Sequence, residues 1–467
     1  MFERAVYTQR RNVLKKQVRS GLLLFPGNEE SPMNYPANTY PFRQDSSFLY
    51  FFGLDTPGVA AVIDVDAGTE TIFGDDITLE DVIWMGDLPK IKDRAAAVGV
   101  KRTAPLARLD ETITQARKKD RPVHFLPPYR SETLNRLSGL LSVQPQKVRR
   151  RVSAELIKAV VNQRSTKNEE EVAEIEKSLA VSRQMYSVAM AMARPGLYER
   201  DVVGAIEGLA LAQGCMTAFP TILSMNVHVF HNQDHGHRLK KGRLLVIDSG
   251  VSSARGYASD ITRTIPVSGT FSQKQREVYE IVLEAQLQAI AAMRPGARFK
   301  DIHLATAKTM ASGLKGIGLM KGDIDEAVAA GAHALFFPHG LGHMIGLDVH
   351  DMEGLGEDYV GYDASVKRSK QFGLAYLRMA RELKSGFVLT VEPGIYFVPA
   401  LIDRWQAEKR LAQFIHYSQV ERYRDFTGIR IEDDVLVTKK GSRVLGKPIP
   451  KKAGDIEKAM AAAKVKR

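Results

Sequence analysis

ARPGLYERDVVGAIEGLA, residues 193–210, decides the fold because the chain repeats it. MRPGARFKDIHLATAKTMA, residues 293–311, aligns with it without gaps at an offset of one hundred residues. In both copies a Pro-Gly pair ends one helix, and an apolar pattern of helical spacing begins the next. A single shared Arg-Pro-Gly would mean little, so a duplication is indicated only if the downstream residues of the two copies also match.

The downstream features of each copy recur in one order: a Phe-Pro pair, a histidine, a strand that ends in an acid and a Gly, and a second acid beside a later strand. In the first half these are Phe219-Pro220, His231, Asp248 and Asp260. In the second half they are Phe337-Pro338, His350, Glu392 and Glu432. Two copies of helix–helix–strand–strand predict a pseudo-twofold sheet with a site on its axis.

FFPHGLGHMIGLDVHD, residues 336–351, places three histidines, His339, His343 and His350, within a short stretch. Imidazole is the commonest metal ligand and carries protons near neutral pH. Each glycine in this stretch would cost about 1 kcal/mol inside a helix, and a zinc helix of the HExxH kind would need a Glu after its first His. We therefore expect irregular backbone leading into a strand, IGLDVH. A glycine-rich turn with incidental histidines is the alternative.

The four repeated acids strengthen the catalytic interpretation. Asp248, Asp260, Glu392 and Glu432 cannot all stay ionised in one place unless cations compensate them. Two divalent cations bridged by carboxylates would neutralise the cluster and lower the pKa of a water between them. Oxygen-rich ligation suits Mn, Mg or Ca, and one imidazole also admits Zn, Co or Fe. The alternative is a set of ordinary strand-end acids paired with arginines.

Length and composition indicate an ordinary globular protein. With 467 residues, 44% hydrophobic and 26% charged, the chain should hold two or more domains. It has no run of eighteen apolar residues, so we expect no membrane-spanning helix. One cysteine, Cys215, indicates a reduced compartment, the cytoplasm, and is expected to be a small buried hydrophobe.

The formal net charge of +12 is concentrated at the C-terminus. Residues 439–467 contain ten Lys/Arg and two Asp/Glu, a net of +8. We expect residues 446–467 to be a solvated basic tail. The tail lacks the interleaved aromatic residues of a single-strand binder, so nucleic acid is not favoured as a partner.

Residues 1–163 read as a smaller mixed α/β unit. FLYFFGL (48–54), VAAVIDV (59–65) and VHFLP (123–127) are predicted strands, and residues 91–98 and 131–141 are predicted helices. The polar run NQRSTKNEEE (162–171) is the predicted linker. Within it, Asn168 caps an acid-rich helix that runs to the first Arg-Pro-Gly.

Five motifs within residues 165–440 together resemble the pita-bread metallopeptidases of the proline-specific branch, aminopeptidase P and prolidase (Xaa-Pro dipeptidase). They are VIDSG, GYASDITRT, HGLGHMIGLDVHD, LTVEPGIYF and GIRIEDDVLVT. RQDSSFLYFFGLDTPGVAAVI is similar to the creatinase-like N-terminal domain of aminopeptidase P. The resemblance implies an α+β protein with an α/β N-terminal domain (1–163), a pseudo-twofold pita-bread catalytic domain (164–445) and the basic tail (446–467). It also implies a cytoplasmic homo-oligomer, most simply a dimer.

The resemblance further implies two divalent metal ions, typically Mn, with Zn or Co as the alternatives. The implied metal ligands are Asp248, Asp260, His343, Glu392 and Glu432. Among them Asp260 and Glu432 would bridge both ions, and a bridging hydroxide would attack the scissile carbonyl. Glu392 would be the proton shuttle.

Other residues take their implied roles from the same motifs. His350, together with His339, would stabilise the oxyanion or handle the departing amine, and His231 would line the proline side of the pocket. Arg430 would support the bridging carboxylate of Glu432.

Arg378 decides which activity the resemblance favours. In GLAYLRMARELKSGFVLTVEPG it precedes Glu392 by fourteen residues, as does the prolidase arginine that grips the carboxylate of a dipeptide. A surface arginine is the alternative. We expect a metalloexopeptidase that cleaves the Xaa-Pro bond of small peptides with proline at the second position, leaning to dipeptides. Xaa-Pro aminopeptidase activity on longer peptides, a creatinase-like amidinohydrolase and a non-catalytic pita-bread binding protein are the alternatives.

Overall fold

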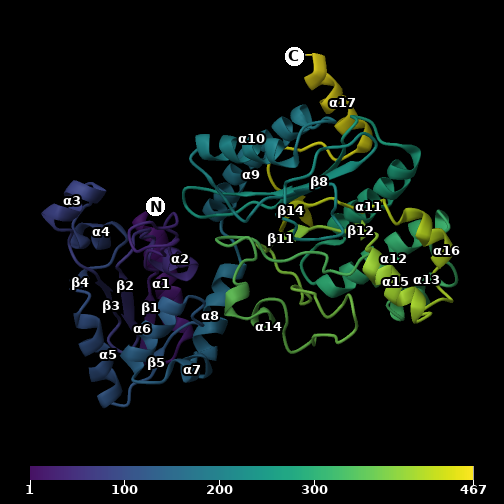
Figure 1. Ribbon diagram of the computed structural model, residues 1–467. Helices are drawn as coiled ribbons and strands as arrows, with labels where there is room; N and C mark the ends of the chain where they lie inside the picture. Colours follow the sequence, from purple (N-terminus) through teal and green to yellow (C-terminus); the bar gives the residue numbers. More distant parts are fainter. Residues whose placement is uncertain (466–467) are drawn as a thin grey trace. The chain divides into compact units, whose positions relative to one another are not determined.

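The computed structural model describes residues 1–465, which divide into two compact units. The N-terminal unit comprises Met1–Arg164 and Gly354–Tyr359, and the C-terminal unit comprises Ser165–Glu353 and the chain from Val360 onward (Figure 1). Both units combine helices with sheets. Within residues 1–465, no helix is both long enough and apolar enough to cross a membrane.

The N-terminal unit is built around a five-stranded sheet in the order β4-β3-β2-β1-β5. The central pairs β1–β2 and β2–β3 are antiparallel, and β4 and β5 add parallel edges. The strands are β1 (Leu22–Pro26), β2 (Ala60–Asp64), β3 (Thr69–Phe73), β4 (Arg102–Ala104) and β5 (Val123–His124). The helices of this stretch are α1 (Arg4–Gln17), α2 (Ser46–Phe52), α3 (Leu79–Met85), α4 (Ile91–Ala97), α5 (Arg108–Lys118), α6 (Ser131–Leu141), α7 (Pro145–Val148) and α8 (Ala154–Ser165). The two predicted helices are confirmed as α4 and α6.

The prediction of a strand over residues 48–54 is wrong, because most of these residues form α2. The Asp45 side chain caps the helix by accepting a hydrogen bond from the Phe48 N–H over 2.9 Å, and Gly53 ends it at a φ of 65°. Phe48 and Phe51 are fully buried. A helix buried on all sides has no polar face, so its sequence resembles the apolar run of a buried strand. The strand predicted at 123–127 is confirmed only for its first two residues.

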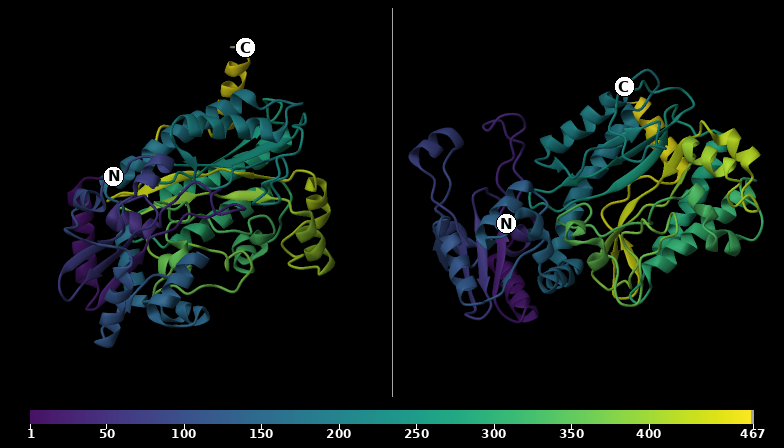
Figure 2. Two further views of the ribbon diagram at one scale, coloured as in Figure 1. Left: turned by 60° about the vertical axis from the view of Figure 1, so that its left-hand side comes forward. Right: turned by 60° about the horizontal axis from the view of Figure 1, so that its bottom comes forward.

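The C-terminal unit contains the two predicted halves (Figures 1 and 2). The first half comprises α9 (Glu169–Met192), α10 (Glu199–Ala212), β6 (Met216–Thr217), β7 (Ile222–Ser224), β8 (Leu244–Ser249), β9 (Val251–Ser252) and β10 (Ile261–Pro266). The second half comprises α11 (Gln273–Ala292), α12 (Phe299–Gly316), β11 (Val388–Val391), β12 (Gly394–Tyr396), β13 (Gly428–Arg430), β14 (Asp433–Val437) and β15 (Ser442–Val444). In each half the two long helices pack together, and two strands pair antiparallel, β8 with β10 and β11 with β14. The predicted duplication of elements is therefore present.

The duplication extends to single backbone hydrogen bonds. The Gly196 N–H donates to the Leu239 carbonyl oxygen over 2.9 Å, and the Gly296 N–H donates to the Leu383 carbonyl oxygen over 3.0 Å. Each leucine also donates back to the residue after the glycine, at 2.7 Å in the first half and 2.8 Å in the second. Both Arg-Pro-Gly turns are thus closed in the same way by a later segment of their own half.

The two halves join at one seam. The Glu432 N–H of the second half donates to the Thr262 carbonyl oxygen of the first half over 3.0 Å, and the Asp260 N–H donates to the Asp434 carboxylate over 3.1 Å. Two of the four repeated acids, Asp260 and Glu432, therefore lie beside each other although they come from different halves. The structure thus brings two of the predicted acids together where the two halves meet.

The prediction of a strand over residues 345–350 is wrong. Only Met344, just before it, forms an isolated bridge to β11, and the chain then turns. The turn is tight at Gly346, where a Cβ atom would lie 2.5 Å from a carboxylate oxygen of Asp351. Asp351 in turn forms a buried ion pair with Lys167 over 2.8 Å. Ile345 and Leu347 are buried within this turn, and Val349 lines a cavity, so the apolar side chains do not lie on alternate faces of a strand.

The prediction that residues 446–467 form a solvated tail is also wrong over the described part. This part forms α17 (Ala453–Val465), which packs against α9 and buries Ile456 and Met460. Before the helix, Lys451 donates to the Asp433 carboxylate over 2.6 Å. The apolar residues recur at helical spacing, but the density of lysines around them masked the pattern.

The remaining helices follow α12 in the chain. They are α13 (Ile324–Ala329) and α14 (Glu357–Val360), which precede β11, and α15 (Pro399–Ala407) and α16 (Tyr417–Val420), which lie between β12 and β13. The 3₁₀ turns are Arg149–Arg151 in the N-terminal unit, and Ala332–Leu335, Glu353–Leu355 and Glu421–Tyr423 later in the chain. Trp405 of α15 is buried, with its ring centroid 6.1 Å from that of Phe372. The stretch between β12 and β13 is therefore a packed part of the C-terminal unit.

Candidate active site

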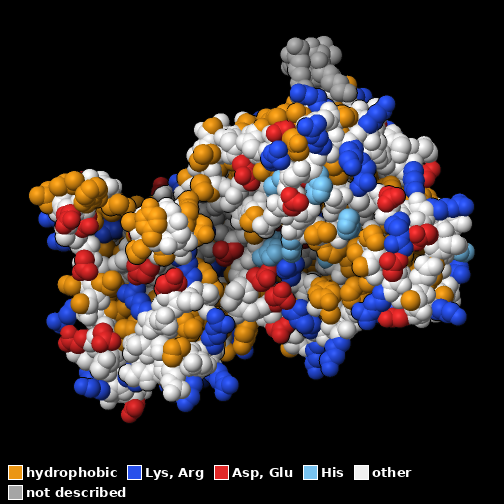
Figure 3. Space-filling model, in the orientation of Figure 1, with side chains coloured by type: hydrophobic (Ala, Val, Ile, Leu, Met, Phe, Trp, Pro, Cys, Tyr) orange, Lys and Arg blue, Asp and Glu red, His pale blue; other side chains and the backbone are white. Residues whose placement is uncertain are grey.

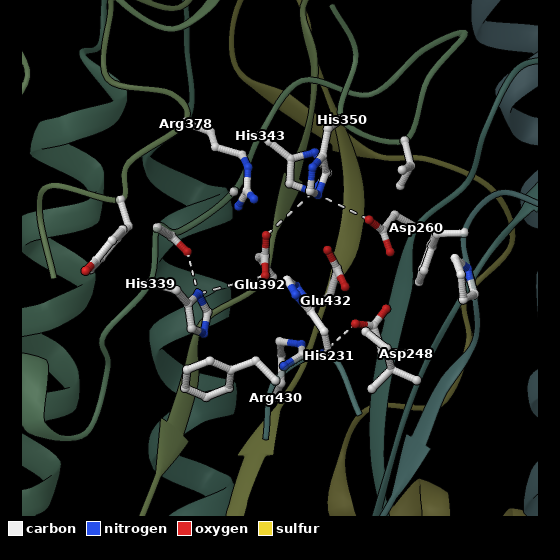
Figure 4. Close-up of a pocket in the computed structure, with 18 of the residues that line it drawn as sticks. His231, Asp248, Asp260, His339, His343, His350, Arg378, Glu392, Arg430 and Glu432 are labelled. Carbon is white, nitrogen blue, oxygen red and sulfur yellow. Dashed lines mark hydrogen bonds and ion pairs between the residues drawn. The ribbon is translucent and has the colours of Figure 1, made fainter. Parts of the chain in front are cut away.

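The C-terminal unit contains a cavity of about 330 Å³, a volume that suits a small molecule. Its walls hold every residue for which we predicted a role (Figure 4). These residues are His231, Asp248, Asp260, His339, His343, His350, Arg378, Glu392, Arg430 and Glu432. In the orientation of Figure 1, histidine and acidic side chains reach the surface of the C-terminal unit together (Figure 3).

Strand geometry brings the four acids together. In the first half, Asp248 lies in β8 and Asp260 immediately precedes β10, its antiparallel neighbour. In the second half, Glu392 immediately follows β11 and Glu432 immediately precedes β14, again antiparallel neighbours. Antiparallel pairing places the end of one strand beside the start of the next. Each half therefore supplies two carboxylates at one end of its sheet.

Hydrogen bonds orient His343 so that one ring nitrogen, Nε2, faces the acids. Its backbone N–H donates to Thr390 Oγ1 over 3.0 Å, and its ring Nδ1–H donates to the Met344 carbonyl oxygen over 3.0 Å. Nε2 then lies 3.4 Å from an Asp260 oxygen and 3.6 Å from a Glu392 oxygen. Burial lowers the pKa of His343 well below its usual value, so Nε2 carries a lone pair. A lone pair that faces two carboxylates needs a cation between them.

The carboxylates themselves need compensation. Burial, reinforced by the neighbouring carboxylates, raises the pKa of Asp260 and of Glu432 well above the usual range. Burial raises the pKa of Glu392 to about 7 against the opposing charge of Arg430. One carboxylate oxygen of Asp248 and one of Asp260 are buried and have no hydrogen-bond partner within residues 1–465. Unpaired buried carboxylate oxygens are costly unless a cation or a proton satisfies them.

The arrangement fits a divalent cation. Asp260, His343 and Glu432 each offer one ligand atom, and these three atoms all lie within 4.8 Å of one another. Asp248 and Glu392 face the same cavity. Carboxylate oxygens with a single imidazole nitrogen are a donor set for Mn²⁺, Zn²⁺ and similar ions. The five candidate metal ligands are thus gathered at one place.

The predicted support of Glu432 by Arg430 is indirect. Arg430 Nη2 donates to Asp248, and Nη1 donates to the Tyr396 hydroxyl over 2.9 Å. Its Nε donates to Thr262 Oγ1 over 3.2 Å, and the Thr262 hydroxyl donates to a Glu432 oxygen over 2.6 Å. The guanidinium at the end of β13 reaches across to β8 rather than along its own chain to Glu432. Its direct carboxylate partner is therefore Asp248.

His339 is held on both ring nitrogens. Its Nδ1–H donates to the Gly340 carbonyl oxygen over 2.8 Å, and its Nε2 accepts from the Tyr396 hydroxyl over 2.9 Å. Burial lowers the pKa of His339 to about 3, which keeps the ring neutral. Its Nδ1 is 3.9 Å from an oxygen of Glu392. Tyr396 therefore connects His339 with Arg430 behind the acids.

His350, Arg378 and His231 lie on the cavity wall around the acids. The ring centroids of His343 and His350 are 4.2 Å apart. His350 and Arg378 lie above Glu392 in Figure 4, and His231 lies beside Arg430 and Asp248. Both His350 and Arg378 contact a carboxylate outside the cavity lining, Glu353. These side chains surround the carboxylates but do not all point at one atom.

Family models match both units of the chain. Residues 173–439, more than half of the chain, match the model of metallopeptidase family M24. This chain belongs to metallopeptidase family M24. Residues 7–124 match the aminopeptidase P N-terminal domain. The family implies divalent metal ions, which is consistent with the gathered ligands.

Similar proteins cover almost the whole chain. The chain is 30% identical over 466 residues to Xaa-Pro dipeptidase of Homo sapiens, covering 94% of this chain and 88% of the relative. It is 31% identical over 476 residues to Xaa-Pro aminopeptidase of Escherichia coli, covering 99% and 98%. Among solved structures, a variant of E. coli aminopeptidase P in complex with substrate and the Zn-substituted enzyme in complex with product each give a TM-score of 0.81 at 29% identity over 99% of both chains. The predicted fold and family are confirmed.

Three side chains that hold the site together, Thr262, Tyr396 and Glu353, were not among the predicted residues. Thr262 and Tyr396 lie within the quoted motifs GYASDITRT and LTVEPGIYF. Thr262 could have been found, because it lies two residues after Asp260 on the same face of β10. Glu353 had only its spacing of three residues from His350 as a signal.

Proposed function

We propose that this protein hydrolyses the Xaa-Pro bond of small peptides and prefers Xaa-Pro dipeptides. The observation that carries the proposal is that Arg378 lines the cavity that holds the five candidate metal ligands. A guanidinium suits a carboxylate, and in a dipeptide the terminal carboxylate belongs to the proline beside the scissile bond. Relatives named Xaa-Pro dipeptidase and Xaa-Pro aminopeptidase support the specificity for proline.

Two divalent ions, Mn²⁺ by preference, would be held by Asp248, Asp260, His343, Glu392 and Glu432. When bound, such a pair of ions activates water and polarises the scissile carbonyl. Asp260 and Glu432 lie at the seam between the halves, which supports a bridging role for both. The Thr262 hydroxyl, which donates to Glu432, would orient that carboxylate.

Proton transfer would fall to Glu392. Its place in the cavity beside the other candidate ligands supports a carboxylate that takes a proton from the attacking water and returns it to the departing proline nitrogen. His350, on the same side of the cavity as Arg378 in Figure 4, would face the scissile bond. His339 is neutral and bonded on both nitrogens, so it would contribute through orientation of Tyr396 and through contact with substrate rather than by supplying a proton.

The proline ring would lie against the aromatic side of the cavity. Phe230 lines this side. The centroid of its ring is 4.6 Å from that of the Tyr396 ring and 5.8 Å from that of the His339 ring. His231, the next residue in the chain, lines the cavity as well. Proline has no backbone N–H, so the ring requires apolar contact rather than a hydrogen-bond acceptor. This wall supports a preference for proline after the scissile bond.

Xaa-Pro aminopeptidase activity on longer peptides is the second candidate. Arg378 Nε already donates to Glu353 over 2.9 Å, so one side of its guanidinium is committed to the protein. Similarity to E. coli aminopeptidase P over 99% of both chains also favours this activity. A longer peptide would place an amide, not a carboxylate, near Arg378.

Metal removal and peptide cleavage test the proposal. Protein treated with a chelator should release no proline from Ala-Pro, and added Mn²⁺ should restore release. Faster cleavage of Ala-Pro than of Ala-Pro-Ala would support the dipeptidase, and the reverse would support the aminopeptidase. Failure of activity to return with Mn²⁺, Zn²⁺ or Co²⁺ would favour the non-catalytic binding protein. Light scattering on the same sample would test the homodimer that the family resemblance implies.

A further inference from the structure

One carboxylate oxygen holds two of the side chains that line the cavity. Glu353 Oε2 lies 2.7 Å from His350 Nδ1 and accepts a hydrogen bond from Arg378 Nε over 2.9 Å. A short turn produces this contact, because the Glu353 N–H also donates to the His350 carbonyl oxygen over 3.2 Å. Glu353 itself does not line the cavity, but it contacts two residues that do, His350 and Arg378.

We propose that Glu353 is a positioning residue that fixes the orientation of both His350 and Arg378 and so couples recognition of a peptide carboxylate to the placement of His350 at the scissile bond. This inference rests on the proposed function. Its chemical content is that one protein carboxylate orders two substrate-facing groups through a single oxygen.

The tautomer of His350 follows from the chemistry of a carboxylate. The hydrogen bond from His350, together with the charge of Arg378, lowers the pKa of Glu353 to about 2 against the effect of burial. An ionised carboxylate only accepts hydrogen bonds, so the nearby Nδ1 of His350 must carry a proton. Nε2 is then the nitrogen that His350 can offer to a peptide. Without Glu353 both tautomers would be accessible.

Arg378 is held by the same oxygen. The side chains of His350, Arg378 and Glu353 are each about one-third exposed, at 33%, 34% and 37%. Long charged side chains with this exposure lose much of their pair energy to solvent unless the geometry is fixed. Two donors that converge on one ionised oxygen give such a geometry. Glu353 is the partner of both Arg378 and His350. A peptide carboxylate that draws Arg378 toward the cavity would therefore also change the contact between Glu353 and His350.

The experiment compares Glu353→Gln and Glu353→Ala with Glu382→Gln, which removes the same charge from an exposed position four residues after Arg378. With Mn²⁺ bound, Glu353→Ala should lower kcat for both Ala-Pro and Ala-Pro-Ala by about 10- to 100-fold. The KM for Ala-Pro should rise more than the KM for Ala-Pro-Ala, because only the dipeptide carboxylate needs Arg378. Glu353→Gln keeps one acceptor oxygen and should lie between wild type and Ala. Glu382→Gln should match wild type.

A second readout does not depend on activity. In ¹⁵N-histidine NMR spectra of the Zn²⁺-loaded protein, with the His350 signals assigned by their loss in His350→Gln, wild type should show the Nδ1–H tautomer. Glu353→Ala should shift these signals toward a mixture, and Glu382→Gln should not. If wild type releases no proline from either peptide, the proposed function fails, while the NMR comparison still tests Glu353.

Two results would overturn the inference. Unchanged kcat and unchanged His350 signals in Glu353→Ala would show that Glu353 orders neither group. Loss of metal or of the folded state in both Glu353 variants would show a general structural role instead.

Discussion

The two halves of the C-terminal unit share one backbone plan but contribute differently to the cavity. Each half closes its Arg-Pro-Gly turn with the same hydrogen bonds and supplies two carboxylates. The chain between the turn and the leucine that closes it is about twice as long in the second half (296–383) as in the first (196–239). The long segment carries His339, His343, His350 and Arg378, whereas the short one contributes His231 among the residues labelled in Figure 4.

We infer from this comparison that the acids at the strand ends of both halves hold the metal ions, and that the longer segment of the second half, here called the insertion, handles the peptide. His343 is the exception, since it comes from the insertion yet is anchored on β11 through Thr390. Substitutions in the duplicated strand ends should therefore remove metal. Substitutions elsewhere in the insertion should change kinetics while metal stays bound.

The largest effect is expected for Asp260→Asn, which keeps the shape of a shared ligand but removes its charge. Metal content, measured by mass spectrometry of the purified protein, should fall, and proline release should drop by more than about 100-fold, since even residues that only orient metal ligands cost about 10- to 100-fold. Glu284→Gln, a change of the same charge on the exposed face of α11, is the control. Full metal content in Asp260→Asn would contradict the inference that the strand ends of the two halves hold the metal ions.

His350→Ala should have the next largest effect and should spare the metal. Loss of a placed proton-handling or oxyanion-binding side chain typically costs about 10²–10⁴-fold in rate, so kcat for Ala-Pro should fall within this range. Metal content should stay at the wild-type level. Loss of metal would mean that His350, and not His343, belongs to the ligand set.

Arg378→Ala tests whether this part of the chain distinguishes dipeptides from longer peptides. Removal of a charge-assisted hydrogen bond to the dipeptide carboxylate should raise the KM for Ala-Pro by about 10- to 100-fold. The KM for Ala-Pro-Ala should change little. Arg378→Lys keeps the charge but not the planar fork, so it should recover only part of the loss. Equal changes in KM for both peptides would show that Arg378 does not bind the carboxylate of the dipeptide.

Lys167→Met should have the smallest effect on kcat and a clear effect on stability. Lys167 precedes α9 of the first half, and its buried ion pair with Asp351 ties it to the insertion of the second half. Breaking a buried pair typically costs about 3–5 kcal/mol in the free energy of unfolding, measurable by denaturant titration. Replacing both partners, in Lys167→Met/Asp351→Leu, should recover part of this loss. An unchanged midpoint in the single variant would show that the pair does not hold the insertion.

The acids and His343 could be predicted from the sequence because local patterns determine their positions. In each half an acid near the end of an apolar strand is followed two residues later by a glycine (Asp248 and Glu392), and a second acid lies beside a later strand (Asp260 and Glu432). This repeated order can be read without knowledge of the tertiary fold. The paired turns at Gly196 and Gly296 could be predicted for the same reason. Patterns of this kind depend on strand register and helix ends, which are set within a few residues.

Other features depend on contacts between distant segments and could not be predicted. The apolar run in α2 resembles a buried strand because nearly all of its side chains are buried in the N-terminal unit, and the tail helix α17 packs on α9 although its sequence is rich in lysine. Arg430 reaches Asp248 across the sheet rather than Glu432 beside it. Glu353 gains its two partners through a turn whose glycine-rich neighbourhood gave no regular pattern.

Titration of metal-free protein with Mn²⁺ tests the central claim most directly. Isothermal calorimetry on wild type should give two Mn²⁺ per chain, and Glu432→Gln, which alters a ligand proposed to belong to both ions, should weaken both binding events together. One ion per wild-type chain, or two unchanged binding events in Glu432→Gln, would contradict the claim that carboxylates from both halves form one site for two metal ions.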